Sequence, residues 1–321
     1  MITYRPASLD DAALAADLMT DAYPAFAQDP VLTRIRWESP RKGFAYGRFI
    51  AERAGAPVGY VGWIHGPWEK LPDRHCEVEV WLDRRSLNGE LLDSMFTWAG
   101  DQAIAEGSRL LMAYCAEDEP EMLASLSDLG YRRERVERVW QLDLREHGPR
   151  LVEELKRARQ VLADGGITLT ALSSWQDPDA LKKLLELSNL TTQDIPHTLP
   201  ILDESYEDYA RRMHAPDRPH DRIWIALHGG KPVSLSYLKF PPVRGTVWTS
   251  YTCTHPEYRG RGLARAVKLQ TLAQAVELGV PFVCTTNDSE NAPILHLNQA
   301  LGYVSRPGFV EHHKRVTNRD A

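Results

Sequence analysis

The stretch 251–303 reads YTCTHPEYRGRGLARAVKLQTLAQAVELGVPFVCTTNDSENAPILHLNQALGY, and it decides the fold. Its β-rich start cannot continue through Pro256, because proline has no N–H to donate to a neighbouring strand. Apolar residues then recur at helical spacing, and Gly279 is the expected end of that helix. The stretch predicts, in order, a strand ending at Thr254, a glycine-rich turn at 257–262, a helix over 263–278, a strand at 282–284 and a helix over 292–301.

The glycine-rich turn, EYRGRG at 257–262, is suited to bind an anion. Gly260 and Gly262 let the backbone approach a ligand closely, and the first N–H groups of the following helix have no partner within that helix. The positive end of the helix dipole favours a phosphate or diphosphate there, and Arg259 and Arg261 add positive charge. A purely structural β-to-α connection is the alternative. The spacing fits neither a P-loop nor the Gly-x-Gly-x-x-Gly fingerprint.

Two motifs in this stretch resemble those of the GCN5-related N-acetyltransferase (GNAT) family. Arg259-x-x-Gly262-x-Ala264 after a proline-containing strand end is similar to its motif A, and Asn291 with the later Asn298-x-x-Leu301-Gly302-Tyr303 is similar to its motif B. The resemblance implies acetyl-CoA as the acyl donor, with its diphosphate on the backbone of 261–264 and its pantetheine along 252–254. The cofactor-binding residues that it implies are Thr252, Cys253, Thr254, Arg259, Gly260, Arg261, Gly262, Leu263, Ala264 and Asn291.

Composition and charge are those of an ordinary globular protein. Of the 321 residues, 43% are hydrophobic and 26% are charged, and the formal net charge is −6 without a block of like charge. This balance argues against a nucleic-acid-binding surface. The sequence has no run of about 18 apolar residues and no signal peptide. We therefore expect a cytoplasmic protein that contacts no membrane and is a monomer or homodimer.

Cysteine and histidine positions predict neither a disulfide nor a metal site. The cysteines lie apart and form no Cys-x-x-Cys pair. Cys76, Cys253 and Cys284 sit within apolar runs, which predicts that these three are reduced and buried. His312 and His313 have no partner ligands at suitable spacing, so we expect no metal. The four cysteines are Cys76, Cys115, Cys253 and Cys284.

An internal repeat sets the domain organisation. The spacing from Gly107 to Gly130 equals that from Gly279 to Gly302, and each interval runs from a helix end through an apolar strand to a helix ending in Leu-Gly-Tyr. We predict an α/β protein with a mixed sheet in each of two tandem GNAT domains, each sheet twisted, mostly antiparallel and flanked by helices. The predicted ranges are 1–145 for the first domain, 146–165 for a helical linker and 166–321 for the catalytic domain.

The first copy lacks the glycine turn of the second. Where the second reads RGRGLA at 259–264, the first reads RRSLNGE at 84–90, so the motif glycine is missing in either plausible register. Glu90 would also place a carboxylate beside a diphosphate, which is electrostatically unfavourable. We predict a degenerate N-terminal copy that does not bind coenzyme A productively and supports the active copy. A retained ligand site in it is the alternative.

Catalytic residues are harder to assign, because acyl transfer to an amine needs a base, an oxyanion donor and an acid for the leaving thiolate. Members of the family commonly have a tyrosine at the position of Asn298, and that tyrosine acts as the general acid. An asparagine amide cannot supply a proton and can only orient the thiol or a water. Protonation of the thiolate could then come from water or from His296. The family's strand carboxylate is also missing. Thr249, Ser250 and Tyr251 could instead hold a water as a relay, although strand propensity alone also explains Thr and Tyr there.

The variable segment 191–209 is the expected source of a base and of acceptor contacts. It carries Asp194, His197, Asp203 and Glu204, of which Asp194 is our candidate for binding the acceptor amine and Glu204 the next. Helix capping or a solvated loop charge is the alternative for both. An acidic loop facing the donor favours a small cationic molecule with a primary amine. The predicted function is therefore an acetyl-CoA-dependent N-acetyltransferase.

Two other functions stay open. The missing acid and strand carboxylate also suit an acyl-CoA-binding regulatory or scaffold module without turnover. Transfer to protein or peptide amines would need an open groove, about which the sequence is silent.

Overall fold

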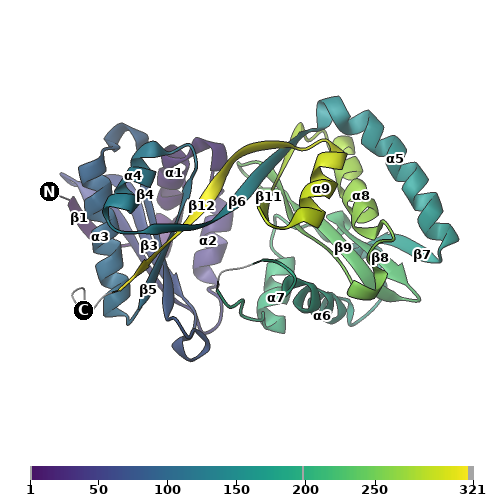
Figure 1. Ribbon diagram of the computed structural model, residues 1–321, viewed down its shortest axis with the longest axis horizontal. Coiled ribbons are helices and arrows are strands. Elements are labelled where there is room, and N and C mark those ends of the chain that lie inside the picture. Colours follow the sequence, from purple (N-terminus) through teal and green to yellow (C-terminus); the bar gives the residue numbers. More distant parts are fainter. Residues whose placement is uncertain (1, 197–198, 317–321) are drawn as a thin grey trace. The chain divides into compact units, whose positions relative to one another are not determined.

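The structure, a computed structural model, describes residues 2–196 and 199–316 and divides into two compact units (Figure 1). The N-terminal unit consists of Met1–Glu137, Pro242–Gly245 and Pro307–Ala321, and the C-terminal unit of Arg138–Pro241 and Thr246–Arg306. Each unit has a mixed sheet flanked by helices, which confirms the predicted fold class. No helix in the described ranges is long and apolar enough to cross a membrane.

The N-terminal unit is built on strands in the order β1-β2-β3-β4-β5-β12. All neighbours in this order are antiparallel except β4 and β5, which are parallel. Its elements are β1 (Ile2–Pro6), α1 (Ala12–Ala22), α2 (Pro30–Glu38), β2 (Ala45–Arg53), β3 (Ala56–His65), β4 (His75–Leu82), α3 (Gly89–Ala105), β5 (Leu110–Ala116), α4 (Pro120–Asp128) and parts of β6 (Arg132–Asp143) and β12 (Val304–Arg315).

The C-terminal unit repeats this arrangement with strands in the order β7-β8-β9-β10-β11-β6. The strands from β7 to β10 are antiparallel to their neighbours, and β10 is parallel to β11. Its elements are α5 (Leu144–Asp164), β7 (Ile167–Ala171), α6 (Ala180–Thr192), α7 (Tyr206–Met213), β8 (Ile223–His228), β9 (Lys231–Lys239), β10 (Val247–Thr254), α8 (Leu263–Glu277), β11 (Phe282–Asp288), α9 (Ala292–Leu301) and the remaining parts of β6 and β12.

The order of elements is the same in both units: a strand, two helices, three strands, a helix, a strand, a helix and a strand. This identity confirms the predicted tandem repeat. The sequence analysis did not predict α2, although its start carries two standard signals. Asp29 caps it by accepting from the N–H groups of Val31 and Leu32, and Pro30 occupies the first turn.

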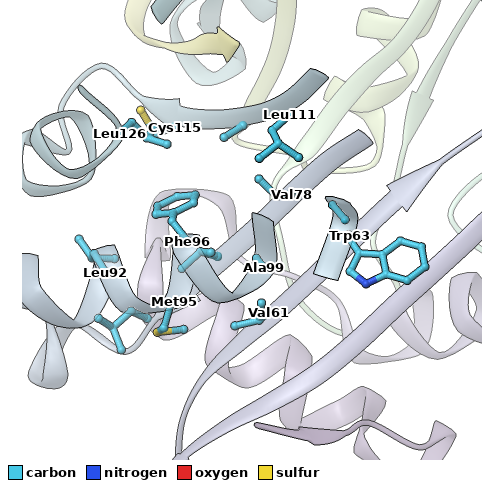
Figure 2. Packing of buried hydrophobic residues seen from close by; sticks show 14 of the residues in the cluster. Val61, Trp63, Val78, Leu92, Met95, Phe96, Ala99, Leu111, Cys115 and Leu126 are labelled. Carbon is cyan, nitrogen blue, oxygen red and sulfur yellow. The ribbon is translucent and has the colours of Figure 1, made fainter. Parts of the chain in front are cut away.

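The core of the N-terminal unit lies between its sheet and α3 and α4 (Figure 2). Val61 and Val78 reach from the sheet toward Leu92, Met95 and Phe96 of α3, and all five side chains are buried. Strand β4 alternates strictly between partly buried and buried residues because successive side chains point to opposite faces of a sheet. Its other face therefore carries Glu77, Glu79 and Trp81.

The residue ranges of the two compact units differ from the predicted domain ranges, which were 1–145, 146–165 and 166–321. Helix α5, which includes most of the predicted linker, packs along α8 within the C-terminal unit (Figure 1). The end of β12 pairs with β5 from Phe309–Ala116 to Arg315–Leu110 and so belongs to the N-terminal unit. Strand exchange of this kind depends on pairing between distant segments, which local sequence patterns do not encode.

Val310 provides a test of this strand assignment. Its side chain is 1% exposed and lies opposite Cys115 on β5, whereas Val304 on the same strand is 54% exposed. We expect Val310→Ala to lower the free energy of unfolding by about 1.5–3 kcal/mol, since it removes buried apolar surface. Urea denaturation measures this change, and hydrogen exchange should show lost protection in peptides from β5.

Val304→Ala is the matched control and should change the free energy of unfolding by less than about 0.5 kcal/mol. Equal effects of both substitutions, or unchanged exchange in β5, would contradict the assignment of the last strand to the N-terminal unit.

Candidate active site

The site begins where two parallel strands separate. Strands β10 and β11 pair at Val247–Val283 and Trp248–Cys284, and the described residues show no further pairing between them. On its other side, β10 stays paired with β9 as far as Thr254–Ser234. The main chain of β10 from 249 to 253 therefore has no strand partner on the side facing β11, and the N–H and C=O groups on that side are available to an extended ligand.

Ser250, the predicted water relay, lies at an irregularity in β10. Thr249 is paired with Leu238 and Tyr251 with Tyr237, so Ser250 is an extra residue in the strand. A bulge of this kind bends the strand and changes the direction of the side chains beside it. The bulge lies beyond Trp248, the last residue of β10 that is paired with β11.

The predicted anion-binding turn has an open geometry. Gly260 and Gly262 adopt φ angles of +73° and +77°, which other residues adopt only with strain. A Cβ atom added to either glycine would meet nothing within 4 Å. Gly262 is the N-cap of α8 and gives it no side-chain cap. The N–H groups of Leu263, Ala264 and the next residue thus lack intrahelical acceptors and receive no side-chain cap from Gly262.

The two arginines of the turn are exposed and held by main-chain oxygens. Arg259 donates through Nε to the carbonyl oxygen of Thr254 at 3.2 Å, and Arg261 donates through Nη2 to that of Glu257 at 3.2 Å. Arg261 also lies over the ring of Tyr258, 5.0 Å from its centroid. Both guanidinium groups are placed beside the open end of α8, where they add positive charge.

The side chains of the predicted pantetheine strand serve the fold. Thr252 and Thr254 pair through their Oγ1 atoms with the hydroxyls of Ser236 and Ser234, each at 2.9 Å. Cys253 points to the opposite face and is 8% exposed, and burial raises its pKa to about 12. A thiol with that pKa is not a nucleophile near neutral pH. All four cysteines are buried and free, which confirms the prediction made for Cys76, Cys253 and Cys284.

Asn298 is fully buried on α9 and has an incomplete set of hydrogen bonds. Its Nδ2 atom donates to Oδ1 of Asn287 at 2.6 Å, while its own Oδ1 atom has no hydrogen-bond partner among the described residues. A buried oxygen without a donor is costly, and it is satisfied by any ligand or water that brings one. Asn291 is the N-cap residue of the same helix and provides no side-chain cap.

Residues 184–303 match the acetyltransferase (GNAT) family. This segment is a GNAT domain. It contains α8, α9, β10, β11 and therefore every residue discussed above. Among curated protein sequences, none matches the chain significantly.

Solved structures extend the likeness to both units. A tandem GNAT protein from the clavulanic acid biosynthesis pathway has 18% identity and a TM-score of 0.77, with 98% of each chain covered. A GNAT from Sphaerobacter thermophilus has 17% identity and a TM-score of 0.66 over 98% of this chain and 95% of that one. A glucosamine N-acetyltransferase region of a fungal multi-domain GH3 β-N-acetylglucosaminidase has 12% identity and a TM-score of 0.67, covering 98% and 38%.

These identities show the fold alone, and that fold is a tandem GNAT fold. It supports acyl-CoA-dependent acetyl transfer in general. The described residues contain no group of three or more His, Cys, Asp or Glu side chains that could hold a metal ion.

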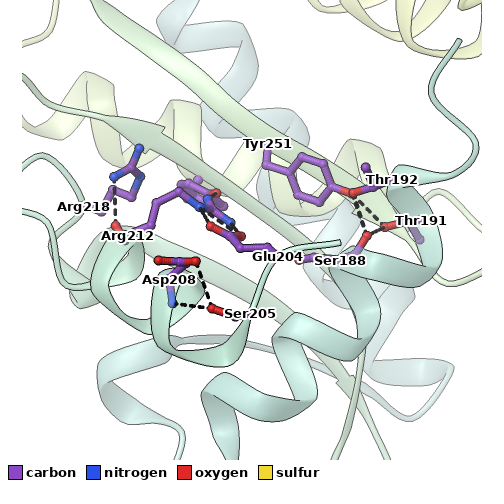
Figure 3. Close-up of polar contacts among 10 residues, drawn as sticks. Ser188, Thr191, Thr192, Glu204, Ser205, Asp208, Arg212, Arg218 and Tyr251 are labelled. Atoms are coloured by element: carbon purple, nitrogen blue, oxygen red, sulfur yellow. Dashed lines mark hydrogen bonds and ion pairs between the residues drawn. The ribbon is translucent and has the colours of Figure 1, made fainter. Parts of the chain in front are cut away.

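Tyr251 connects β10 of the GNAT domain to the end of α6 (Figure 3). Its hydroxyl lies 2.9 Å from Oγ1 of Thr191 and 3.1 Å from Oγ1 of Thr192, and donates to the carbonyl oxygen of Ser188 at 3.3 Å. Burial raises the pKa of Tyr251 to about 12. The phenol therefore keeps its proton near neutral pH and is a structural contact rather than a base.

The carboxylates predicted to face the acceptor are both in ion pairs. Asp194 accepts from Nη2 of Arg259 at 2.5 Å, so the structure brings together a predicted acceptor contact and a predicted donor contact. Glu204 binds Arg212, with Nη2 and Oε2 2.6 Å apart, and Arg212 also donates to the hydroxyl of Tyr237 at 2.8 Å (Figure 3). His197 lies outside the described residues.

Sequence reasoning missed Lys268, which is 1% exposed on α8. Its Nζ atom lies 4.8 Å from the centroid of the Tyr303 ring, and that tyrosine's hydroxyl is 3.5 Å from Oγ1 of Thr249 in β10. Burial lowers the pKa of Lys268 to about 7. The signal in the sequence was a lysine within the apolar stripe of the helix, VKL at 267–269.

The pH dependence of stability tests the state of this lysine. The unfolded chain keeps the Lys268 proton up to a pH near 10.5, and the folded chain only up to about 7, so folding releases a proton between these values. Stability therefore rises with pH in that window, by up to about 1.4 kcal/mol per pH unit. We expect Lys268→Met to be more stable than the parent at pH 7 and this advantage to shrink toward pH 10.

Lys231→Met, at an exposed position on β9, is the control and should differ from the parent by the same amount at every pH. Urea denaturation from pH 7 to 10 measures both variants. A pH-independent advantage of Lys268→Met would mean that the lysine is charged in the folded protein.

Proposed function

We propose that the GNAT domain transfers an acetyl group from acetyl-CoA to the primary amine of a small cationic molecule. The observation that carries the proposal is the uncapped start of α8 at Gly262, next to the strand edge that β11 leaves free. Together they offer an anion site and an extended main-chain edge, which match the two ends of a nucleotide-linked thioester donor.

The equivalent corner of the N-terminal unit lacks this site. The side chain of Asn88 caps α3 by accepting from the N–H of Leu91 at 2.9 Å, and Glu90 lies in the first turn. Asp83 accepts from the N–H of Arg85 at 3.1 Å. A side chain thus uses one of the N–H groups at the start of α3, and the first turn of that helix carries a carboxylate. This contrast supports donor binding at α8 and a supporting role for the N-terminal unit.

The contacts that we propose for acetyl-CoA use the main-chain groups of α8 and β10 that have no partner within a helix or sheet. The N–H groups at the start of α8, from Leu263 onward, would hold the diphosphate, with Arg261 and Arg259 as charge partners. The free edge of β10 would pair with the pantetheine amides. Acetyl-CoA supplies an activated thioester; the chain supplies its position and the exclusion of water.

Proton transfer constrains the mechanism. An alkylammonium has a pKa of about 10.4 and a thiol of about 8.5, so the acceptor must lose a proton and the leaving thiolate gains one near neutral pH. Asn298 Oδ1 would accept a hydrogen bond from the donor or a water and fix its direction. Ser250 on the bulge would hold the water that takes up the amine proton, because Tyr251 stays protonated.

The acceptor class rests on the acidic segment 191–209. Asp194 is the proposed contact of the acceptor amine. If its carboxylate bound the ammonium group of the acceptor in place of Arg259, the guanidinium group of Arg259 would be free to bind a phosphate. One structural neighbour is described as a glucosamine N-acetyltransferase region, and glucosamine is a small molecule with one primary amine. That description supports the class of acceptor.

Gly262→Asn tests the donor site, because it would introduce at α8 the cap that Asn88 provides to α3. Asparagine tolerates a left-handed conformation, and its side chain would bind the N–H groups that the diphosphate needs. We expect the Kd of acetyl-CoA, measured by calorimetry, to rise about 10- to 100-fold, as expected for the loss of charge-assisted hydrogen bonds worth about 1.5–3 kcal/mol.

The matched control is Gly279→Asn. Gly279 also has a left-handed φ, of +72°, and open space around it, but it lies beyond the other end of α8. Its substitution should leave the Kd unchanged. Unchanged affinity in Gly262→Asn would place the donor elsewhere.

An acyl-CoA-binding module without turnover is the second candidate, and the ion pairs of Asp194 and Glu204 favour it because they leave neither carboxylate free to act as a base. Asn298→Ala separates the two functions. For an enzyme we expect kcat to fall at least tenfold with little change in the Kd of acetyl-CoA, since a positioning contact is lost. Gln299→Ala, at an exposed position on the same helix, is the control and should keep full activity.

A sensor would show tight binding and no transfer to any amine in a broad panel, with either residue at position 298. Steady-state kinetics with thiol detection measures the transfer.

A further inference from the structure

The N-terminal unit contains a cavity of about 100 Å³ between the ends of β4 and β5. These strands pair from His75–Leu110 to Glu77–Met112, and the described residues show no pairing beyond that point. One water molecule needs about 10–15 Å³ of such space, so the cavity has room for a small organic molecule. Its walls are mainly apolar and include Tyr23, Met122 and Phe309.

Aromatic side chains shape one wall of the cavity. Tyr23 stacks on Phe26 with ring centroids 5.2 Å apart, and Phe309 meets Phe26 edge to face at 4.5 Å. The hydroxyl of Tyr23 donates to Asp118 at 2.9 Å, which fixes the ring. A rigid aromatic wall favours a ligand with an apolar body.

Charge in and around the cavity is negative. Glu77 and Glu79 line it from β4, and Glu119 lines it beside α4. Glu119 is paired with Arg84. Burial raises the pKa of Glu79, and the positive charges of Arg36 and Arg48 act against this rise. A diphosphate would meet these carboxylates and the capped start of α3, so the cavity does not fit coenzyme A.

Glu77 is the carboxylate without compensation. No side-chain hydrogen bond or ion pair from the described residues reaches it. The charged neighbours that raise its pKa are Glu79, Glu311 and Glu137. Glu311 is itself bound by the Tyr114 hydroxyl at 3.0 Å and by Nε2 of His313 at 2.7 Å, and its Oε2 lies 3.9 Å from Nε of Arg135. Burial and these neighbours raise the pKa of Glu77 to about 8.

We infer that this cavity binds a small organic ammonium ion with an apolar body, held at its charged end by the Glu77 carboxylate. An ammonium group supplies the missing positive charge and up to three N–H donors, and the apolar body replaces water on the aromatic wall. The site is separate from the GNAT domain, and its occupancy does not depend on acetyl transfer.

Binding is coupled to a proton. The raised pKa of Glu77 favours its protonated form in the free protein, and a bound ammonium ion favours the carboxylate. Each binding event should therefore release up to one proton from the Oε–H of Glu77 to the buffer. Neutral ligands of the same shape would release none.

Calorimetry with benzylamine and benzyl alcohol tests the site in the full chain without acetyl-CoA. At pH 7 we expect benzylamine to bind at least tenfold more tightly than benzyl alcohol. The binding enthalpy should differ between phosphate and Tris buffers by an amount that corresponds to proton release. Glu77→Gln should abolish both the preference and the release, whereas Glu134→Gln, at an exposed position on β6, should change neither.

A second variant tests the cavity independently in case Glu77→Gln does not fold. Ala22 is half-buried and lines the cavity, and Ala22→Phe should fill it and weaken both ligands while Glu77 stays in place. Equal affinity for the amine and the alcohol, or amine binding unaffected by both variants, would overturn the inference. Displacement of benzylamine by coenzyme A in a Gly262→Asn background would also overturn it. None of these results depends on whether the GNAT domain transfers acetyl groups.

Discussion

In both units, a pair of parallel strands at the centre of the sheet separates after two or three residue pairs, and the other features of each site depend on this separation. A strand that loses its partner leaves main-chain donors and acceptors unpaired, which is costly unless a ligand or side chains take their place. The C-terminal unit adds a bulge at Ser250 immediately beyond the separation. The N-terminal unit has a cavity at the equivalent position.

The start of the helix after each separated strand differentiates the two copies. The helix after β10 starts at a left-handed glycine without a side chain, and the helix after β4 starts at an asparagine that caps it. A single residue thus decides whether the helix N–H groups are available to an anion. The copies also differ in carboxylates: β4 carries Glu77 and Glu79, whereas the matching stretch of β10, Trp-Thr-Ser at 248–250, carries none. One copy is suited to an anionic donor and the other, by our inference, to a cation.

Local patterns account for most of what could be predicted. The helix over 292–301, the glycine turn and the repeat were all visible in the sequence, because glycine positions, prolines and apolar spacing act over a few residues. Helix α2 was missed despite its Asp-Pro start, since nine residues show no clear apolar stripe. The pairing of Asp194 with Arg259, and the burial of Lys268 against Tyr303, depend on residues far apart in the chain.

The sequence by itself determined the tandem α/β fold, the glycine-rich turn before α8 and the loss of that turn in the first copy, because each depends on residues close together in the chain. Only the tertiary structure decided that the end of β12 completes the sheet of the N-terminal unit, that Asn298 keeps an unpaired oxygen and that Glu77 faces a cavity. Strand pairing, burial and charge compensation are set by contacts across long sequence separations, which no local pattern specifies.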